Sequence, residues 1–398
     1  MCGICGVVDF DEKPSHRAVE LMNETLIHRG PDMSGISQFE GCILGHRRLS
    51  ILDLSESARQ PMVAPDGSLA LVFNGEIYNF LPLRASLEKK GHVFRTTSDS
   101  EILLALYQEK QERMLDDLNG MFSFAIWDVE RRRLFMARDR LGKKPLYYHF
   151  NGHRMSFSSE LFSLIQDSQV PRGLSQKAFL EYLLYDFVPA PHSIFSGIHK
   201  LPAAHMAFFD QHGVTLKRYW QPPLPEHDQD YEEAKEKLAE LLSDAVRLRL
   251  ISDVPLGAFL SGGIDSSLVT ALMTQSSSER IKTFSVTFPG TSHDESKWSQ
   301  RAAAHLGTDH HEYSSNLNEE EIFPMLVRHF GEPFGDSSSL PTWQLCRHTR
   351  TDVTVALSGD GGDELFGGYD RYLARRLQII YDFLPVAFRR KIFEPLLA

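Results

Sequence analysis

The first half of the chain alternates short apolar runs with turn residues, a pattern typical of β-strands. The predicted strands lie in GICGVVDF, GCILGHRRLSILD, LALVFNGEIYN, MFSFAIWDVERRRLFMARD, PLYYHF and RMSFSSE. Within the fourth segment, ERRRLF separates two apolar runs and predicts a hairpin turn. Apolar residues at helical spacing predict helices over 16–26, 83–90 and 101–110. Strands with helices packed outside them predict a layered α/β sandwich with a largely antiparallel sheet.

The chain changes character at RYWQPPLPEHDQDYEEAKEK, where three prolines precede acidic residues. This composition predicts a linker over 219–230, between a first domain (1–218) and a second domain (231–398). A helix over about 231–249 opens the second domain. The apolar strands VPLGAFL, IKTFSVTF and DVTVAL then alternate with helices, one of which ends at Gly307 as its C-cap. Buried strands alternating with helices predict a doubly wound parallel α/β domain.

Composition and charge restrict the class of protein. The 398 residues are enough for about two or three domains. The longest apolar runs fall far below the ~20 residues of a membrane-spanning helix, and no export signal opens the chain. A formal net charge of −11 argues against a general nucleic-acid binder. Four cysteines do not make a disulfide framework, so we expect a cytoplasmic protein.

The segment LSGGIDSS (260–267) follows an apolar strand and precedes a helix. Two glycines let the backbone bend around an anion, while serine hydroxyls and the helix N-terminus supply donors. The loop is neither a Walker A motif nor G-x-G-x-x-G, and it resembles the PP-loop of the ATP pyrophosphatases. The alternative is a glycine turn with a Ser or Asp N-cap.

A second glycine-rich segment, LSGDGGDELFGGY (357–369), also follows a predicted parallel strand. Ligands of doubly wound sheets bind at the carboxyl ends of the strands. Asp265 of the first loop and Asp360, Asp363 and Glu364 of the second would therefore face one crevice. Carboxylates near a triphosphate indicate Mg²⁺. The alternative is a solvated acidic turn.

The chain begins MCGICG, which contains a C-x-x-C pattern. In a strand, residues three apart point to opposite faces and lie roughly 10 Å apart, whereas a disulfide needs Cα atoms within about 7 Å. No second C-x-x-C is present to complete a zinc site. Loss of Met1 would instead leave Cys2 with a free α-amine that can activate its own thiol. We expect Cys5 to be a core residue on the opposite face of the strand.

These segments resemble, in order along the chain, the motifs of one enzyme family. MCGICG, HRGPD, GHRRLSI, NGEIYN, TSDSE, LNGMFSFAIWD and ARDRLGKKPLYY look like the class II glutamine amidotransferase domain. LSGGIDSS, TFSVTF and LSGDGGDELFGGY look like the synthetase domain of the glutamine-hydrolysing asparagine synthetases. The resemblance covers almost the whole chain. It implies an N-terminal-nucleophile (Ntn) αββα sandwich followed by a Rossmann-like, doubly wound PP-loop domain.

The resemblance also implies roles in the first domain. Cys2 would attack the glutamine carboxamide, and Asn74 with the N–H of Gly75 would form the oxyanion hole. Arg48 would hold the α-carboxylate, while Glu76 and Asp99 would hold the α-amino group. The implied glutamine-binding residues are Arg48, Leu49, Ser50, Ile51, Leu52, Asn74, Gly75, Glu76 and Asp99. Asp99 also suits a helix N-cap, 28–32 suits a structural turn, and His46 is not expected to be the base.

In the second domain the resemblance implies an ATP site with Mg²⁺ at Asp265 and Asp363. The implied ATP-binding residues are Leu260, Ser261, Gly262, Gly263, Asp265, Ser266, Ser267, Val286, Ser358 and Gly359. The aspartate side chain would become an acyl-adenylate, from which ammonia displaces AMP along a shielded route. We expect Asp294–Ser296 to begin a helix near the nucleotide. Asp360 is implied as catalytic, at a position where many family members have Glu.

Several expectations and alternatives remain. Family members extend beyond FGGY, so we expect the chain ending at Ala398 to be truncated, with amide synthesis impaired and glutaminase chemistry retained. The expected partners are glutamine, aspartate and ATP, without nucleic acid or membrane, in a possible homodimer. The acceptor could be another carboxylate, and an inactive scaffold is a further alternative. His311-Glu312 does not continue into H-E-x-x-H, because Ser315 occupies the second His position; we expect His310 and His311 at a strand edge.

Overall fold

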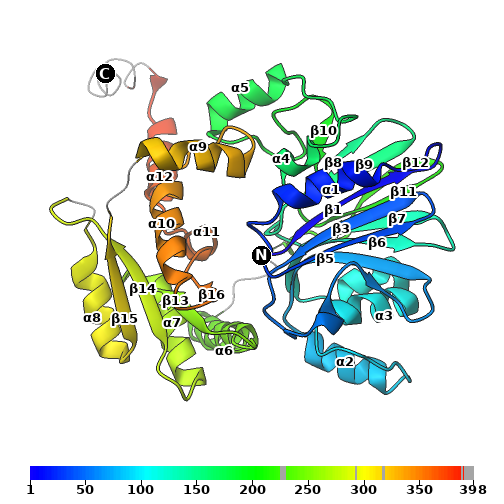
Figure 1. Ribbon diagram of the computed structural model, residues 1–398. Helices are drawn as coiled ribbons and strands as arrows, with labels where there is room; N and C mark the ends of the chain where they lie inside the picture. Colours follow the sequence, from blue (N-terminus) through cyan, green and yellow to red (C-terminus); the bar gives the residue numbers. More distant parts are fainter. Residues whose placement is uncertain (225–229, 292–293, 316–318, 387–388, 390–398) are drawn as a thin grey trace. The chain divides into compact units, whose positions relative to one another are not determined.

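The computed structural model in Figure 1 describes residues 1–224, 230–291, 294–315, 319–386 and 389. The chain divides into two compact units, each described by itself below. The first comprises Met1–Pro255 and Asn316–Cys346, and the second Leu256–Ser315 and Arg347–Ala398. Among the described residues, no helix combines the length and the apolar character needed to cross a membrane.

Two six-stranded sheets form the body of the first unit, and every pairing within them is antiparallel. The first sheet has the order β10-β8-β9-β1-β3-β2, and the second β12-β11-β7-β6-β5-β4. The strands of the first sheet are β1 (Gly3–Asp9), β2 (Met33–Phe39), β3 (Cys42–Arg48), β8 (Tyr147–Phe150), β9 (Arg154–Ser158) and β10 (Ile198–Lys200). Those of the second are β4 (Met62–Val63), β5 (Leu69–Ile77), β6 (Gly120–Asp128), β7 (Arg133–Arg138), β11 (His205–Asp210) and β12 (Gly213–Arg218).

The alternation of side chains along the strands produces four layers. In β1, Ile4 and Val8 join the core between the two sheets, whereas Cys5 and Val7 pack under the helices outside the first sheet. The inner residues of β5 likewise face the first sheet, and its outer residues pack against α2 and α3. Figure 1 shows α1 over the first sheet and α3 over the second. The predicted αββα sandwich is therefore confirmed, as is the expected core position of Cys5.

Helices close the outer faces of this sandwich. They are α1 (His16–Thr25), α2 (Phe80–Glu88), α3 (Ser100–Lys110), α4 (Leu161–Leu164) and α5 (Gln176–Tyr185), with 3₁₀ turns η1 (Glu56–Ala58) and η2 (Gln111–Asp116). All six strand-containing segments and all three helices predicted in the first half are present, and ERRRLF forms the turn between β6 and β7. The edge strands β2 and β12 were not predicted, because their polar, partly exposed residues give little apolar signal.

The first unit also includes parts of the chain beyond residue 230. These are α6 (Tyr231–Arg249), at the bounds predicted from the sequence, α9 (Glu319–Phe330) and most of α10 (Ser339–Thr349). The Lys200 ammonium pairs with Glu332, and the N–H of Gly335 donates to the Asp186 carbonyl at 2.7 Å. The compact units thus differ from the domains 1–218 and 231–398 that the sequence predicts. Those domain bounds stay a prediction. Residues 225–229 of the predicted linker lie outside the described residues.

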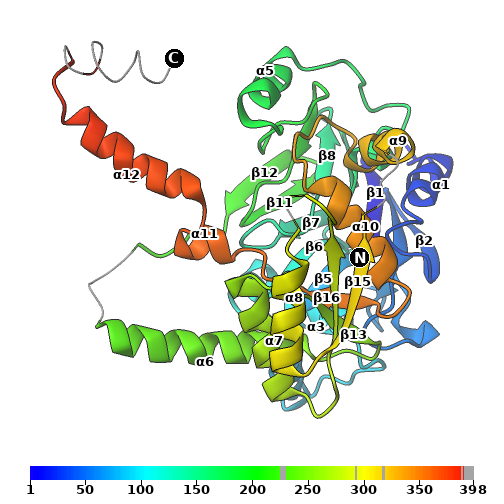
Figure 2. The ribbon, with the colours of Figure 1, turned by 90° about the vertical axis from the view of Figure 1, so that its left-hand side faces the viewer.

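The second unit contains four parallel strands in the order β15-β14-β13-β16. They are β13 (Leu256–Phe259), β14 (Lys282–Thr287), β15 (Asp309–Ser314) and β16 (Val355–Leu357). The helices are α7 (Ile264–Ser276), α8 (Ser296–Leu306), α11 (Gly362–Phe366) and α12 (Asp370–Asp382). Figure 2 shows α7 and α8 side by side along the sheet. Gly307 caps α8 in the left-handed conformation, and β15, with His310 and His311, is an edge strand; both expectations are confirmed.

The strand order of this sheet reverses between β13 and β16. From β13 the chain proceeds to β14 and then β15 on one side, whereas β16 adds to the other side of β13. Such a switch point leaves a crevice at the carboxyl ends of the two strands, where open α/β sheets bind ligands. The loops after β13 and β16 are the two glycine-rich segments singled out in the sequence. The topology therefore brings both to one edge.

Candidate functional site

Cys2 lies immediately before β1 and is partly buried. Its thiol lies 3.7 Å from the carbonyl oxygen of Leu49, and its own carbonyl accepts a 2.9 Å hydrogen bond from Arg29 Nε. Cys5, in contrast, is fully buried, with its Sγ 4.0 Å from the Val19 carbonyl oxygen. Cys2 and Cys5 form no disulfide, which confirms that C-x-x-C is not a dithiol bridge here.

Burial controls the chemistry at this end of β1. It raises the pKa of the Cys2 thiol against the opposing effects of the α-amine and Arg48. The thiol is therefore not ionised by its surroundings, and it needs a base to become a nucleophile. Burial also lowers the pKa of the Met1 α-amine to about 5. The Met1 α-amine is therefore mostly neutral near pH 7, which is the form that a general base requires.

Asn74 and Gly75 lie side by side on β5. The Asn74 side chain is fully buried, and neither its Nδ2 nor its Oδ1 has a hydrogen-bond partner among the described residues. A buried unpaired amide costs roughly 1–3 kcal/mol, so this carboxamide is placed for a ligand or a transition state. A Cβ atom at Gly75 would lie 2.2 Å from the Met121 carbonyl oxygen. Only glycine therefore fits the strand next to the asparagine.

Two carboxylates, Glu76 and Asp99, lie close to this strand. Burial and, to a lesser extent, the nearby charge of Glu76 raise the pKa of Asp99 to about 7, against the effect of the Ile77 N–H, which donates to Asp99 Oδ2 at 2.9 Å. Burial likewise raises the pKa of Glu76, against the nearby charge of Lys144. Asp99 occupies the position before α3, but its side chain makes no capping hydrogen bond. The alternative role of its carboxylate as a helix N-cap is therefore wrong.

Arg48 ends β3 and is almost fully buried. Its Nη2 donates to the carbonyls of Leu52 at 2.9 Å and Asp53 at 2.5 Å, and its Nη1 donates to the Ser55 carbonyl at 3.2 Å. The guanidinium thus organises the loop that contains the predicted glutamine-binding residues 49–52. A carboxylate that paired with both terminal nitrogens would have to replace some of these carbonyls.

The residues around HRGPD form a turn beside the site, as expected. The N–H of Ser50 donates to Asp32 Oδ2 at 2.8 Å, and a Cβ atom at Gly30 would lie 2.3 Å from the Arg47 carbonyl carbon. His46 is fully buried, and its Nε2 donates to the Phe73 carbonyl at 3.0 Å. Burial lowers the pKa of His46 to about 3. A neutral, enclosed imidazole fits the expectation that His46 is not the base.

Arg29 and its partner Glu160 were not predicted as site residues from the sequence. Both side chains are buried, and Arg29 Nη1 donates to Glu160 Oε1 at 2.8 Å while Arg29 Nε binds the Cys2 carbonyl. Arg29 lies within the HRGPD motif, which was a usable signal. Glu160 is 131 positions away, and no local pattern connects it to the motif.

The loop after β13, which resembles a PP-loop in sequence, forms a tight turn. Gly262 has φ +86°, and a Cβ atom there would lie 2.3 Å from the Trp298 carbonyl carbon, in the first turn of α8. The N–H of Gly263 donates to Ser261 Oγ at 3.3 Å, and the Ser261 and Ser266 hydroxyls lie 3.1 Å apart. The loop therefore passes tightly against α8, which begins at Ser296 as expected, and carries its hydroxyls at the exposed N-terminus of α7.

The loop after β16 packs directly on the first loop. A Cβ atom at Gly359 would lie 2.7 Å from the Ser266 nitrogen, and one at Gly362 would lie 2.4 Å from the Asp265 carboxylate carbon. Gly359 thus requires glycine because it meets backbone atoms, whereas a side chain at Gly362 would displace the Asp265 carboxylate. The two loops touch at the switch point of the sheet, which matches the shared edge predicted from the sequence.

Comparison with known proteins identifies the family. Residues 1–220 match the family described as glutamine amidotransferase domain, and residues 237–392 match that described as asparagine synthase. A putative glutamine-hydrolysing asparagine synthetase 2 of Methanocaldococcus jannaschii is 37% identical over 397 residues, covering 94% of this chain and 76% of that protein. The chain belongs to the glutamine-hydrolysing asparagine synthetase family.

This chain covers a smaller share of two further members of the family. Asparagine synthetase 1 of Bacillus subtilis is 36% identical, over 94% of this chain and 59% of that protein. Asparagine synthetase B of Escherichia coli is 35% identical, over 93% of this chain and 65% of that protein. Among solved structures, the glutamine phosphoribosylpyrophosphate amidotransferase of B. subtilis aligns with 85% of this chain and 92% of its own, at 14% identity and a TM-score of 0.44. The chain thus spans about three fifths of the last two curated relatives named.

Within the synthetase domain of this family member, the acidic residues of the second loop make different contacts. Asp360 Oδ2 accepts a 2.9 Å hydrogen bond from Ser358 Oγ and is exposed. Glu364 Oε1 accepts from the Tyr369 hydroxyl at 2.7 Å, so it is paired locally. Asp363 lies under Gly368, where a Cβ atom would lie 1.9 Å from Asp363 Oδ1. The expectation that all of these carboxylates face one crevice stays a prediction.

The predicted Mg²⁺ ligands fit that ion by their chemistry. Asp265 and Asp363 supply carboxylate oxygens, which Mg²⁺ prefers. The Asp265 carboxylate lies against the backbone of Gly362, where the absence of a Cβ atom leaves room for it. Gly362 directly precedes Asp363 in the chain. Of the other implied ATP residues, Leu260 is buried, with its N–H donating to the Phe284 carbonyl at 2.9 Å, and Val286 lies on β14.

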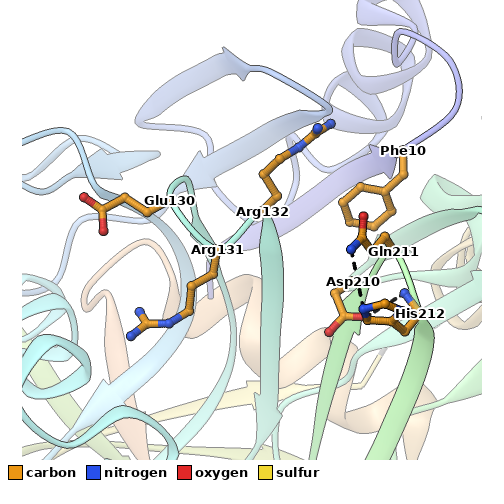
Figure 3. Close-up of a pocket in the computed structure, with 7 residues that line it drawn as sticks. All are labelled: Phe10, Glu130, Arg131, Arg132, Asp210, Gln211 and His212. Carbon is orange, nitrogen blue, oxygen red and sulfur yellow. Dashed lines mark hydrogen bonds between the residues drawn. The ribbon is translucent and has the colours of Figure 1, made fainter.

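A separate hollow of the first unit lies at the ends of two hairpins. Figure 3 shows it between the β6–β7 turn and the β11–β12 turn, lined by Phe10, Glu130, Arg131, Arg132, Asp210, Gln211 and His212. None of these residues belongs to the predicted sites. The Phe10 ring instead packs on Phe209 at 5.0 Å and under the Arg132 guanidinium at 5.8 Å. This hollow is a gap between hairpin ends.

Proposed function

We propose that the first unit hydrolyses glutamine and that the second unit activates a carboxylate with ATP, so that the ammonia released forms an amide. The leading acceptor is aspartate, and the product asparagine. The relatives named above are described as glutamine-hydrolysing asparagine synthetases, and this supports the proposal. The observation that carries it is the buried Asn74 carboxamide with both polar atoms unpaired, on the strand that faces β1.

In the proposed first reaction, the α-amine of Cys2, exposed by loss of Met1, takes the thiol proton. The thiolate attacks the glutamine carboxamide carbon, and the oxyanion is held by Asn74 Nδ2 and the N–H of Gly75. Proton transfer to the leaving nitrogen releases ammonia and leaves a glutamyl thioester, which water hydrolyses to glutamate. Arg48 and the loop 49–52 bind the α-carboxylate, while Glu76 and Asp99 bind the α-ammonium.

In the proposed second reaction, the aspartate side chain attacks the α-phosphate of ATP and expels pyrophosphate. The glycine-rich loop 260–267 binds the leaving pyrophosphate through N–H groups and serine hydroxyls. Mg²⁺, held by Asp265 and Asp363, would neutralise phosphate charge when bound. Leu260, Val286, Ser358 and Gly359 surround the adenosine, and Asp360 acts in the acyl transfer. Ammonia then attacks β-aspartyl-AMP and displaces AMP.

One experiment separates this function from its two alternatives. The full-length enzyme is supplied with glutamine, ATP, Mg²⁺ and aspartate, and glutamate, AMP and asparagine are measured. The proposal expects glutamate in every case and asparagine that depends on aspartate. Glutamate and AMP without asparagine, whatever the aspartate concentration, would favour a different acceptor carboxylate. An absence of all turnover would favour the inactive scaffold.

A matched pair of cysteine variants tests the nucleophile. Cys2→Ala should lower the rate of glutamine hydrolysis by at least about a thousandfold, while Cys5→Ala should retain it. Ammonia supplied directly should bypass the defect of Cys2→Ala in any amide synthesis that the chain performs. Hydrolysis retained in Cys2→Ala would refute the assignment.

A further inference from the structure

Three side chains capable of binding a metal converge in the first unit, and none of them is a predicted Mg²⁺ ligand. His28 lies in the turn after α1, Glu160 lies at the start of α4, and His329 lies in the last turn of α9. One ligand atom from each lies within 4.8 Å of the others. In the part of the chain that the structure describes, no other group of three His, Cys, Asp or Glu side chains meets this condition.

The distances are close to those of a tetrahedral metal site. His28 Nε2 lies 2.9 Å from Glu160 Oε1, and His329 Nδ1 lies 4.0 Å from the same oxygen. Ligand bonds of 2.0–2.1 Å in a tetrahedral zinc site separate neighbouring ligand atoms by about 3.3 Å. The observed distances lie on either side of this value. Small rotations of the two imidazoles would therefore complete three of the four positions.

The surroundings of Glu160 suit a metal-binding carboxylate. Its side chain is 8% exposed, while those of His28 and His329 are 44% and 45% exposed. The carboxylate is thus held in place by the protein, and the imidazoles leave an entry path from solvent. Arg29 donates to Glu160 Oε1 at 2.8 Å. Since the two oxygens of a carboxylate offer about four acceptor sites, Glu160 can keep this hydrogen bond, which orients it, and still bind an ion.

The types of the three side chains indicate which ions would bind. A neutral imidazole has the free lone pair that a metal needs. Two imidazoles with one carboxylate favour Zn²⁺ and neighbouring transition metals over Mg²⁺ and Ca²⁺, which prefer oxygen ligands.

We propose that His28, Glu160 and His329 form a binding site for a divalent transition-metal ion of the Zn²⁺ type, with its fourth position open to water. The ion would connect α9, which lies in the part of the chain matching the asparagine synthase family, to the glutamine amidotransferase part. Such a connection stabilises the first unit. This site is independent of the proposed reaction and of the nucleotide loops.

The test titrates Zn²⁺ alone into the metal-free chain, in a background of Cys2→Ala and Cys346→Ala that removes the two cysteines outside the core. One equivalent should bind, and the melting temperature should rise with Zn²⁺. His28→Ala and His329→Ala should each lower the affinity at least about tenfold and abolish the rise in melting temperature. His92→Ala is the matched control, because His92 pairs with Glu109 at 3.1 Å without a second imidazole.

The proposal would be overturned by no uptake of Zn²⁺ by the parent chain, by unchanged affinity in both histidine variants, or by displacement of the bound Zn²⁺ by an equal concentration of Mg²⁺. Because His28 borders the Cys2 site, His329→Ala alone decides the matter if His28→Ala does not fold. Loss of Zn²⁺ binding in His92→Ala to the same extent as in His329→Ala would also refute the site.

Discussion

The carboxylate of Asp253 accepts a 2.7 Å hydrogen bond from the backbone N–H of Asp53, 200 positions earlier in the chain. Beside it, the N–H of Asp253 donates to the Ile51 carbonyl at 3.0 Å. Asp53 has φ +55°, a left-handed conformation that is unfavourable for a residue other than glycine. The segment after α6 therefore holds the loop of predicted glutamine-binding residues in a conformation that it would not adopt alone.

Removing this acceptor should weaken glutamine binding. In Asp253→Ala the Asp53 N–H loses a charged partner, worth roughly 1.5–3 kcal/mol. Only part of this free energy holds the loop in the conformation that binds glutamine. We therefore expect the KM for glutamine to rise about tenfold with little change in kcat. Steady-state glutaminase assays measure both. Asp244→Ala, on the exposed part of α6, is the control, and equal effects in the two variants would exclude this role.

Asn74→Ala should separate activity from stability. Loss of an oxyanion donor should lower kcat about 10²- to 10³-fold. Thermal stability should not fall, because the variant also removes two buried atoms that have no described partner. Asn79 is the matched control. Its Nδ2 donates to the Asp117 carbonyl and its Oδ1 accepts from the Asn119 N–H, so Asn79→Ala should lose stability and retain kcat. The opposite pattern would contradict the oxyanion role.

Glutamine affinity should depend on pH through Asp99. Its pKa is raised from 3.8 to about 7 in the folded chain without substrate, so the protonated form is favoured there. Its contribution to stability is full below pH 3.8 and is lost as pH rises through about 7. The glutamine α-ammonium binds the ionised form, so KM should fall about tenfold per pH unit as pH rises toward 7 and then level off.

Asp99→Asn is the corresponding variant. Because the asparagine cannot ionise, the KM for glutamine should be higher and should no longer depend on pH between 5 and about 7. The free energy of unfolding should also lose the pH dependence that Asp99 causes over this range. Measurements of KM and of chemical denaturation over that range test both parts. A parent-like pH dependence in Asp99→Asn would assign the titration to another group, of which Glu76 is the nearest candidate.

Gly262→Ala should damage nucleotide binding and leave glutamine hydrolysis intact. A Cβ atom at this position would clash with the backbone of Trp298. The alanine would also have to keep φ +86°, and this backbone conformation alone costs on the order of 1–3 kcal/mol. The affinity for MgATP should fall at least about tenfold, measured by equilibrium titration. Gly307→Ala is the matched control, because Gly307 has φ +68° with nothing within 4 Å of a Cβ atom. Equal losses in both variants would show that the loop contact is unimportant.

Local patterns predicted most of the fold and the loops of the candidate sites. The apolar alternation of β1 and β5 set the faces of both strands, and the glycines of 260–267 marked the loop after β13 because the backbone there has no room for a side chain. The role of Asp99 was less accessible. Its position before α3 suits a cap, but its carboxylate binds the Ile77 N–H instead, and such a choice depends on the tertiary structure.

Contacts between distant positions could not be read from the sequence. Glu160 and His329 come from separate helices, and neither lies in a motif that points to the other. The role of Arg48 toward the glutamine carboxylate stays a prediction, and the sequence did not show that its terminal nitrogens bind the carbonyls of the following loop. A sequence pattern specifies which groups are available, but hydrogen-bonding competition in the folded chain decides which partner each group takes.

The inclusion of 316–346 in the first unit has a consequence for biosynthesis. The ribosome makes both antiparallel sheets of that unit before residue 220, yet Glu332, which pairs with Lys200, and Gly335, which binds Asp186, emerge more than a hundred residues later. Three parallel strands of the second unit are synthesised in between. The first unit therefore lacks its last segment while most of the second unit's sheet is synthesised. A gene fragment that ends at the family boundary near residue 220 would not encode this segment at all.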